Sequence, residues 1–291
     1  RDKRSEEMYL KILLLTDIHG NLPALEAVLR HPAAQGADRV VSTGDHTGFG
    51  PCPRQVTERL MALNADILAS NHEERLPQAD DPAFAGDNWE LLRWTRAQME
   101  GLPLTWPRTL QIGDMLFAHG TPENPNELLE AEEVPALLAR LPESVRWYFS
   151  GHNHNAWNVC AHDCRAVNPG SLGLMEDGVG GRAPFAVIET DGKETRVTRM
   201  MVPYDLEEVK RAYVTGGAAE AAPEMCRIAL YTMETGAYQA ALKFVRLAKQ
   251  LGEKQGISLA DPRAFRMAAE AWDWGDGLSC AEYWRQVARG A

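Results

Sequence analysis

Five of the eight histidines in this 291-residue chain fall in short polar clusters that also contain acidic or amide side chains. The residues of these clusters are Asp17, His19, Asp45, Asn71, His72, His119, His152 and His154. Imidazole combined with carboxylate and amide oxygen suits first-row transition ions such as Mn, Fe, Zn, Co or Ni, whereas Mg and Ca sites are built from oxygen ligands. A lone histidine is more often structural than a ligand, but a group of this size predicts a metal centre.

The number of candidate ligands indicates two ions. The candidate ligands are Asp17, His19, Asp45, Asn71, His119, His152 and His154. They are too many for one ion, but two ions about 3.5–4 Å apart that share one carboxylate can use them all. Two dications outweigh the two aspartates in charge, so the centre would attract an anionic phosphate. Water between the ions would lose its proton near neutral pH and become a hydroxide nucleophile.

His72 is not needed as a ligand. It directly follows Asn71, so it should lie near the centre. A protonated histidine there could donate to the leaving-group oxygen or stabilise charge on the phosphoryl oxygens. The alternative is that His72 is one more metal ligand, or supports the ligands from behind.

The early clusters follow the ends of predicted strands. We predict buried strands at Lys11–Thr16, Arg39–Thr43 and Asp66–Ser70, and helices at Leu22–Arg30 and Arg54–Leu63. This alternation predicts a parallel sheet flanked by helices. Because such sheets bind ligands at the carboxyl ends of their strands, the three clusters should meet at one edge.

The later clusters also follow predicted strands, at Thr109–Ile112, Met115–Ala118 and Trp147–Ser150. His119 comes after the second of these and His152 after the third. Two further strand pairs are predicted, Trp157–Cys160 with Arg165–Val167 and Phe185–Thr190 with Thr195–Met201. Between the strands we predict a loop at Pro77–Gly86 and helices at Asn88–Glu100 and Glu132–Leu141.

The composition changes after Tyr204. Helices are predicted at Asp205–Tyr213, Met225–Leu251 with an interruption at Gly236, Pro262–Trp274 and Ala281–Ala288, and a flexible segment at Gly216–Ala222. None of the polar clusters lies here. We therefore predict a catalytic domain over residues 1–204 and a helical extension over residues 205–291, which packs on the core or forms a dimer contact.

The overall composition narrows the choice of partners. The net charge is −11 and no basic stripe is present, which argues against duplex nucleic acid. No apolar run is long enough to span a membrane. The five cysteines are odd in number and irregularly spaced, so free thiols and a cytoplasmic location are expected. A small or nucleotide-like phosphoester is the expected ligand.

The polar clusters resemble, in order and spacing, the signature of the calcineurin-like metallophosphoesterases. The matching segments are Asp17-Ile18-His19-Gly20-Asn21, Gly44-Asp45, Asn71-His72-Glu73, His119-Gly120 and Gly151-His152-Asn153-His154. The segment Asn168-Pro169-Gly170-Ser171-Leu172-Gly173 is similar to the bacterial and archaeal small phosphodiesterase branch. The resemblance implies an α/β fold, a four-layer α/β/β/α sandwich, here with the C-terminal helical extension.

The resemblance also implies a role for each residue. Asp17, His19 and His154 would hold one ion, and Asn71, His119 and His152 the other. Asp45 would bridge the two ions, and His72 would be the catalytic acid. Two divalent transition-metal ions are thus expected, Mn ahead of Fe, Zn, Ni or Co.

The sequence departs from the family pattern at several positions. Ser70 replaces a glycine, and Asn153 replaces the usual Thr or Ser; both are small changes. His46 follows the bridging Asp45, where an apolar or amide residue is usual; a structural role is favoured over contact with substrate. Arg54 is a second candidate for substrate contact, although an arginine at a helix start is more often solvated.

A missing arginine distinguishes branches of the family. Its protein phosphatases and diadenosine tetraphosphatases carry an Arg shortly after the bridging Asp, which would clamp a dianionic phosphate. Here the stretch of residues 47–51 contains none. The expected activity is therefore that of a phosphodiesterase, with a phosphomonoesterase as the alternative. A non-catalytic binding scaffold is disfavoured, since such relatives lose ligands and this chain keeps all seven.

Overall fold

The computed structural model of the protein describes residues 9–81 and 89–290. Its first sheet contains β1 (Leu10–Leu15), β2 (Arg39–Ser42), β3 (Asp66–Ile67), β9 (Arg182–Thr190) and β10 (Thr195–Pro203). The strand order is β10-β9-β1-β2-β3. β1, β2 and β3 are parallel, as predicted, and β9 pairs antiparallel with β1. β1 therefore lies between β2, the next strand in the sequence, and β9, which comes much later in the sequence.

The second sheet contains β4 (Thr109–Ile112), β5 (Met115–Ala118), β6 (Trp147–Phe149), β7 (Trp157–Ala161) and β8 (Cys164–Asn168). Its strand order is β4-β5-β6-β8-β7. β5, β6 and β8 run parallel to one another, so the loops that follow β5 and β6 leave the sheet at the same edge.

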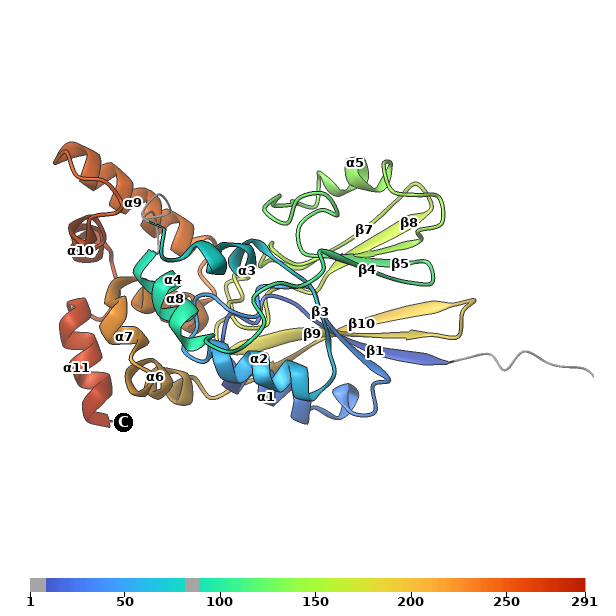
Figure 1. Ribbon diagram of the computed structural model, residues 1–291, viewed down its shortest axis with the longest axis horizontal. Coiled ribbons are helices and arrows are strands. Elements are labelled where there is room, and N and C mark those ends of the chain that lie inside the picture. Colours follow the sequence, from blue (N-terminus) through green and yellow to red (C-terminus); the bar gives the residue numbers. More distant parts are fainter. Residues whose placement is uncertain (1–8, 82–88, 291) are drawn as a thin grey trace, which may run out of the picture.

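The two sheets pack face to face around an apolar core (Figure 1). Leu14 and Ile188 of the first sheet meet Phe117 and Phe149 of the second in this core. The rings of Phe117 and Phe149 stack with their centroids 4.8 Å apart. Burial of such large apolar side chains removes them from water and holds the sheets together.

Helices cover the outer faces of both sheets. α1 (Leu22–Arg30) and α2 (Pro53–Ala62) pack on the first sheet, and α5 (Val134–Leu138) packs on the second. α1 begins where expected, because the side chain of Asn21 accepts a hydrogen bond from the backbone N–H of Ala24. The layers are thus α/β/β/α, which confirms the predicted sandwich.

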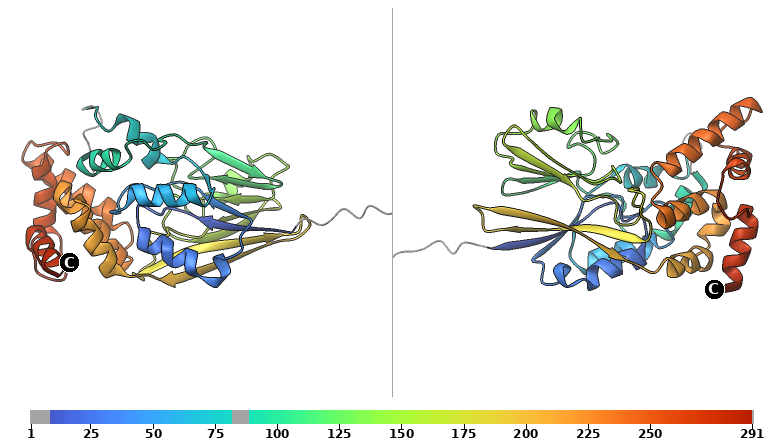
Figure 2. Two further views of the ribbon diagram at one scale, coloured as in Figure 1. Left: turned by 60° about the horizontal axis from the view of Figure 1, so that its bottom comes forward. Right: turned by 180° about the vertical axis from the view of Figure 1, so that it is seen from behind.

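Further helices gather at one end of the sandwich, the end toward which β1 runs (Figures 1 and 2). They are α4 (Trp89–Gln98), α6 (Leu206–Thr215), α7 (Ala218–Ala221), α8 (Pro223–Thr235), α9 (Ala240–Lys254), α10 (Pro262–Ala271) and α11 (Cys280–Gly290). Apolar side chains of α6 to α11 share a cluster with Leu91 of α4 and with Leu174, which lies between β8 and β9. The C-terminal helices therefore pack on the rest of the described chain.

Several boundaries differ from those predicted. The interrupted helix is two separate helices, α8 and α9, because Gly236 ends α8 in the left-handed conformation, with φ 66°. The segment predicted to be flexible contains α7. The short helix α3 (Asn71–Arg75) was not predicted, since five residues are too few for a periodic pattern. Part of the predicted loop at Pro77–Gly86, and the predicted helix start at Asn88, lie outside the described residues.

Within the described residues, none of the helices has the length and apolar character needed to cross a bilayer.

Candidate metal centre

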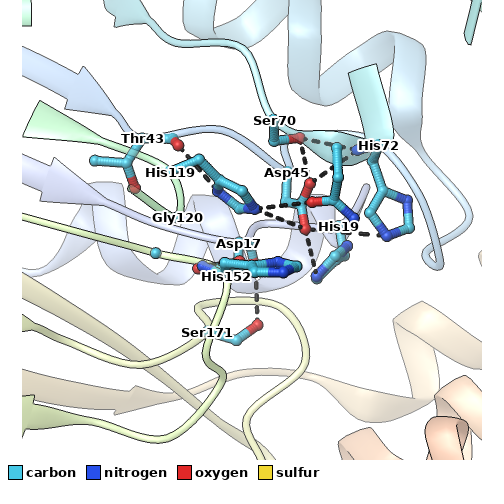
Figure 3. A network of polar contacts seen from close by, with 12 residues as sticks. Asp17, His19, Thr43, Asp45, Ser70, His72, His119, Gly120, His152 and Ser171 are labelled. Atoms are coloured by element: carbon cyan, nitrogen blue, oxygen red, sulfur yellow. Dashed lines mark hydrogen bonds and ion pairs between the residues drawn. The ribbon is translucent and has the colours of Figure 1, made fainter. Parts of the chain in front are cut away.

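The predicted ligands converge near the carboxyl ends of β1 and β2 in the first sheet and of β5 and β6 in the second. Figure 3 shows five of them there, Asp17, His19, Asp45, His119 and His152. Two groups of side chains could each hold an ion, with their ligand atoms within 4.8 Å of one another. One group contains Asp17, His19, Asp45 and His154, and the other contains Asp45, His119 and His152. Asp45 belongs to both groups, as a bridging ligand must.

The carboxylate of Asp45 lies at the centre of the cluster. Its Oδ2 atom is 3.4 Å from Nε2 of His119 and 3.6 Å from Nε2 of His19. The backbone N–H of His72 and the hydroxyl of Ser70 both donate to the other oxygen, Oδ1. The carboxylate is therefore fixed on one side and turned toward the histidines on the other.

The remaining candidate ligands crowd into the same space. Oδ1 of Asn71 lies 3.1 Å from Nε2 of His119. Nε2 of His154 lies 3.0 Å from Nε2 of His19. Oδ2 of Asp17 is buried and has no hydrogen-bond partner, although buried carboxylate oxygens are normally paired. An unpaired oxygen among facing nitrogens is a donor set suited to transition-metal ions.

Three of the rings are oriented from behind. Nδ1 of His19 lies 3.2 Å from the carbonyl oxygen of Thr47, and Nδ1 of His119 lies 3.1 Å from that of Thr43. Nδ1 of His154 lies 3.3 Å from Oε1 of Glu176. An Nδ1–H that donates to oxygen leaves the lone pair on Nε2, the atom that faces the cluster. Such outer hydrogen bonds are characteristic of histidines that bind metals.

The backbone is unusual at the same positions. Asp17, His19, Asp45 and His152 have positive φ values of 50°, 49°, 49° and 66°. Each non-glycine residue in this left-handed region costs on the order of 1 kcal/mol or more, and such residues concentrate at functional sites. Gly48 leaves room for the ring of His72. A Cβ atom at position 48 would lie only 2.6 Å from Nδ1 of His72.

Burial and mutual charge set the protonation of the metal-free cluster. Burial raises the pKa of Asp17 to about 6 and lowers the pKa of His152 to about 3. Burial also acts to lower the pKa of His119, but the adjacent Asp45 carboxylate outweighs it and raises that pKa to about 9. In the absence of metal, the ring of His119 is therefore positively charged at neutral pH, with a proton on each nitrogen.

Comparison with known proteins agrees with this geometry. The family model of the calcineurin-like phosphoesterase superfamily domain matches residues 10–193. The chain belongs to this superfamily. It is a phosphoester hydrolase of a metal-dependent family, and its cluster of histidines and aspartates is the candidate metal centre.

Relatives and solved structures extend the comparison. The chain is 28% identical to phosphodiesterase YfcE of Escherichia coli K12 over 195 residues, which are 62% of this chain and 89% of the relative. It is 25% identical to protein MJ0912 of Methanocaldococcus jannaschii over 230 residues, 69% of this chain and 90% of the relative. A metallophosphoesterase from Sphaerobacter thermophilus shares the fold, with TM-score 0.64 and 24% identity over 78% of this chain and 100% of that one.

The phosphoesterase has a pocket of about 230 Å³ at this cluster. Its polar lining comes from Asp45, Asn71, His72, Arg75, His152, His154 and Glu176. Nε2 of His72 lies 3.9 Å from Oδ2 of Asp45, and His72 is in neither ligand group. Arg75 was not predicted, because the short helix that carries it to the pocket, α3, gives no periodic signal in the sequence.

Two carboxylates of the phosphoesterase were also missed as site residues. Buried Glu73 accepts hydrogen bonds from the backbone N–H groups of Asp45 and Thr47, both at 3.0 Å, and so holds the loop that carries Asp45. Ser70 caps α3, and the spacing from Ser70 to Glu73 is that of a capping box, a signal visible in the sequence. Glu176 had no such signal.

The structure does not place the two predicted substrate contacts, His46 and Arg54, at the pocket of the phosphoesterase. His46 is fully buried, with Nδ1 3.4 Å from Oε1 of Glu73, so it supports the site from behind. The guanidinium of Arg54 donates to Glu58 at 2.7 Å and to the carbonyl of Gln98 at 2.8 Å. Substrate contact, which was the less favoured alternative for both side chains, does not fit these positions.

Proposed function

We propose that this protein is a phosphodiesterase that works with two divalent transition-metal ions. The observation that carries the proposal is the sharing of Asp45 between two groups of ligand atoms. One ion would be held by Asp17, His19, His154 and Asp45. The other would be held by Asn71, His119, His152 and Asp45. Mn is our first choice. Fe, Zn, Ni and Co remain alternatives, because the availability of these ions decides which of them such a site binds.

When bound, such ions supply positive charge that polarises the phosphoryl group and acidifies a water nucleophile. His72 lines the same pocket and is not needed as a ligand, so we assign it the proton that the leaving-group oxygen takes up. Asp17 and Asp45 supply the negative charge that retains the ions. Glu73 and Glu176 hold the ligands in place.

A diester is favoured because phosphodiesterase YfcE is among the relatives and because no arginine follows Asp45 closely. Arg75, which lines the pocket, favours a second candidate activity. A guanidinium can pair with the additional charge of a phosphate monoester. A phosphomonoesterase activity at the same centre is therefore the alternative.

A substrate panel separates the two candidates. One preparation loaded with Mn is assayed with bis(p-nitrophenyl) phosphate, p-nitrophenyl phosphate and cyclic nucleotides. We expect the highest kcat/KM with a diester. A higher value with the monoester would replace the proposal by its alternative, and no turnover with any substrate or metal would remove both. Asp45→Asn, prepared in parallel, controls for contaminating phosphatases.

A further inference from the structure

The C-terminal helices supply part of the pocket at the metal centre. Met225 of α8 and Ala241, Leu242 and Val245 of α9 line it together with residues of the sandwich. Phe49 and Leu174 add to the same apolar surface. We call these six residues the apolar wall. The pocket thus combines a polar part at the candidate ligands with an apolar part that the sandwich alone does not provide.

The residues of α9 differ in how closely they pack against the other C-terminal helices. Ala240, Phe244 and Ala248 are buried in the cluster formed by the C-terminal helices. Leu242 and Val245 are three residues apart, so they lie on a common face of α9. Val245 packs against that cluster as well, whereas Leu242 is 42% exposed and is not part of it. Leu242 is therefore a wall residue that lines the pocket without being part of the helical core.

Two connections hold α9 against the metal centre. In the turn before α9, the backbone N–H of Gln239 donates at 3.0 Å to Oε2 of Glu176, whose other oxygen contacts His154. The hydroxyl of Tyr238 lies 3.4 Å from Oε1 of Glu130, and Asn153 donates at 3.0 Å to the other oxygen of Glu130. Both connections end on the loop that carries the paired histidines. The apolar wall therefore has a fixed position relative to the ligands.

The chemistry of the wall limits what it can bind. Its side chains offer no hydrogen-bonding group apart from the weakly accepting sulfur of Met225. A sugar, a charged headgroup or the polar edge of a nucleobase would lose its hydrogen bonds to water there without replacement, at a cost of about 1–3 kcal/mol for each buried group. A hydrocarbon group loses nothing and gains from burial.

The pocket volume suits a group of modest size. An apolar cavity of about 150 Å³ holds one benzene molecule. A pocket of about 230 Å³ therefore accommodates a phosphoryl group with one ring or a short alkyl chain. We propose that the apolar wall binds an uncharged hydrocarbon group of the substrate, so that alkyl or aryl phosphoesters are preferred; this inference rests on the proposed function.

The test uses two diesters with the same p-nitrophenyl leaving group, one with methyl and one with butyl as the second ester group. The reactivity of the leaving group is then constant. Since a single methylene in an apolar pocket changes kcat/KM by about tenfold or more, we expect the Mn-loaded enzyme to favour the butyl ester at least tenfold. Leu242→Asn should reduce this preference to about twofold, because kcat/KM should fall more for the butyl ester than for the methyl ester.

Leu128→Asn is the matched control. Leu128 is also 42% exposed, but it does not line the pocket, so its replacement should leave the preference unchanged. Val245→Thr, which keeps the shape of the side chain, serves as a second variant if Leu242→Asn does not fold. Circular dichroism establishes folding for each variant.

Three results would overturn the inference. Equal kcat/KM for the two esters with the wild type would do so and leave the proposed function intact, since both esters are hydrolysed. An equal loss for both esters in Leu242→Asn would show a general effect on the site. Absence of turnover for both esters in the wild type would remove the proposed function, and the inference with it.

Discussion

Oε1 of Glu176 lies 3.3 Å from Nδ1 of His154, so a carboxylate outside the ligand set holds the ring of a candidate ligand. This contact fixes the ring orientation and makes Nε2 a better donor to metal. We expect Glu176→Gln to weaken metal binding by about 10–100-fold, the usual effect of losing such a partner. Isothermal titration calorimetry with the metal measures this change in affinity. Glu143→Gln, at an exposed glutamate, should bind as the wild type does; equal affinity in both variants would contradict the role of Glu176.

Asp45 should be required for both ions. Its carboxylate belongs to both ligand groups, so Asp45→Ala removes a ligand from each. We expect about two ions per chain in the reconstituted wild type and close to none in the variant, with turnover abolished. Mass spectrometry of the metal content checks the first point. Retention of one tightly bound ion would show that Asp45 serves a single site.

Replacement of His72 should separate catalysis from metal binding. His72→Asn removes the proposed proton donor while Asp45 and the candidate ligands remain. We expect kcat for a diester with a poor leaving group to fall by about 10²–10⁴-fold, with the metal content unchanged. The loss should be much smaller with p-nitrophenol, which leaves readily without a proton. Loss of metal from His72→Asn would instead make His72 a ligand.

Metal binding should release a proton from His119. The pKa of this residue is raised to about 9 in the metal-free protein, so at pH 7.5 the ring is protonated and must lose a proton to bind an ion. The apparent affinity should therefore rise with pH up to about 9 and then level off. Calorimetry in buffers of different ionisation enthalpy counts the released protons. A heat of binding independent of the buffer would contradict this assignment.

The sequence predicted that the candidate ligands converge, because their signal is local. Asp17, Asp45 and His119 each combine a metal-binding side chain with a position just after a strand, and parallel strands bring such positions together. The alternation predicted the parallel sheet with its flanking helices, and the family resemblance added the four-layer arrangement. α3 could not be found by periodicity, because it has only one and a half turns.

The outer parts of the site could not be predicted because their partners are distant in sequence. Glu176 contacts the backbone of Gln239, 63 residues away, and nothing in its surroundings distinguishes it from a surface carboxylate. Arg75 reaches the pocket only because α3 turns the chain there. The apolar residues of α9 resemble any half-buried helix until the turn before that helix is placed beside the paired histidines.

The order of strands in the first sheet has a consequence for biosynthesis. β1 emerges from the ribosome well before its antiparallel neighbour β9, which begins only at Arg182, after all seven candidate ligands have been made. A nascent chain of that length exposes one edge of a buried apolar strand, which is prone to pair with other chains. Ribosome-stalled or prematurely terminated chains that end before β9 should therefore aggregate and depend on chaperones, although they carry every candidate metal ligand.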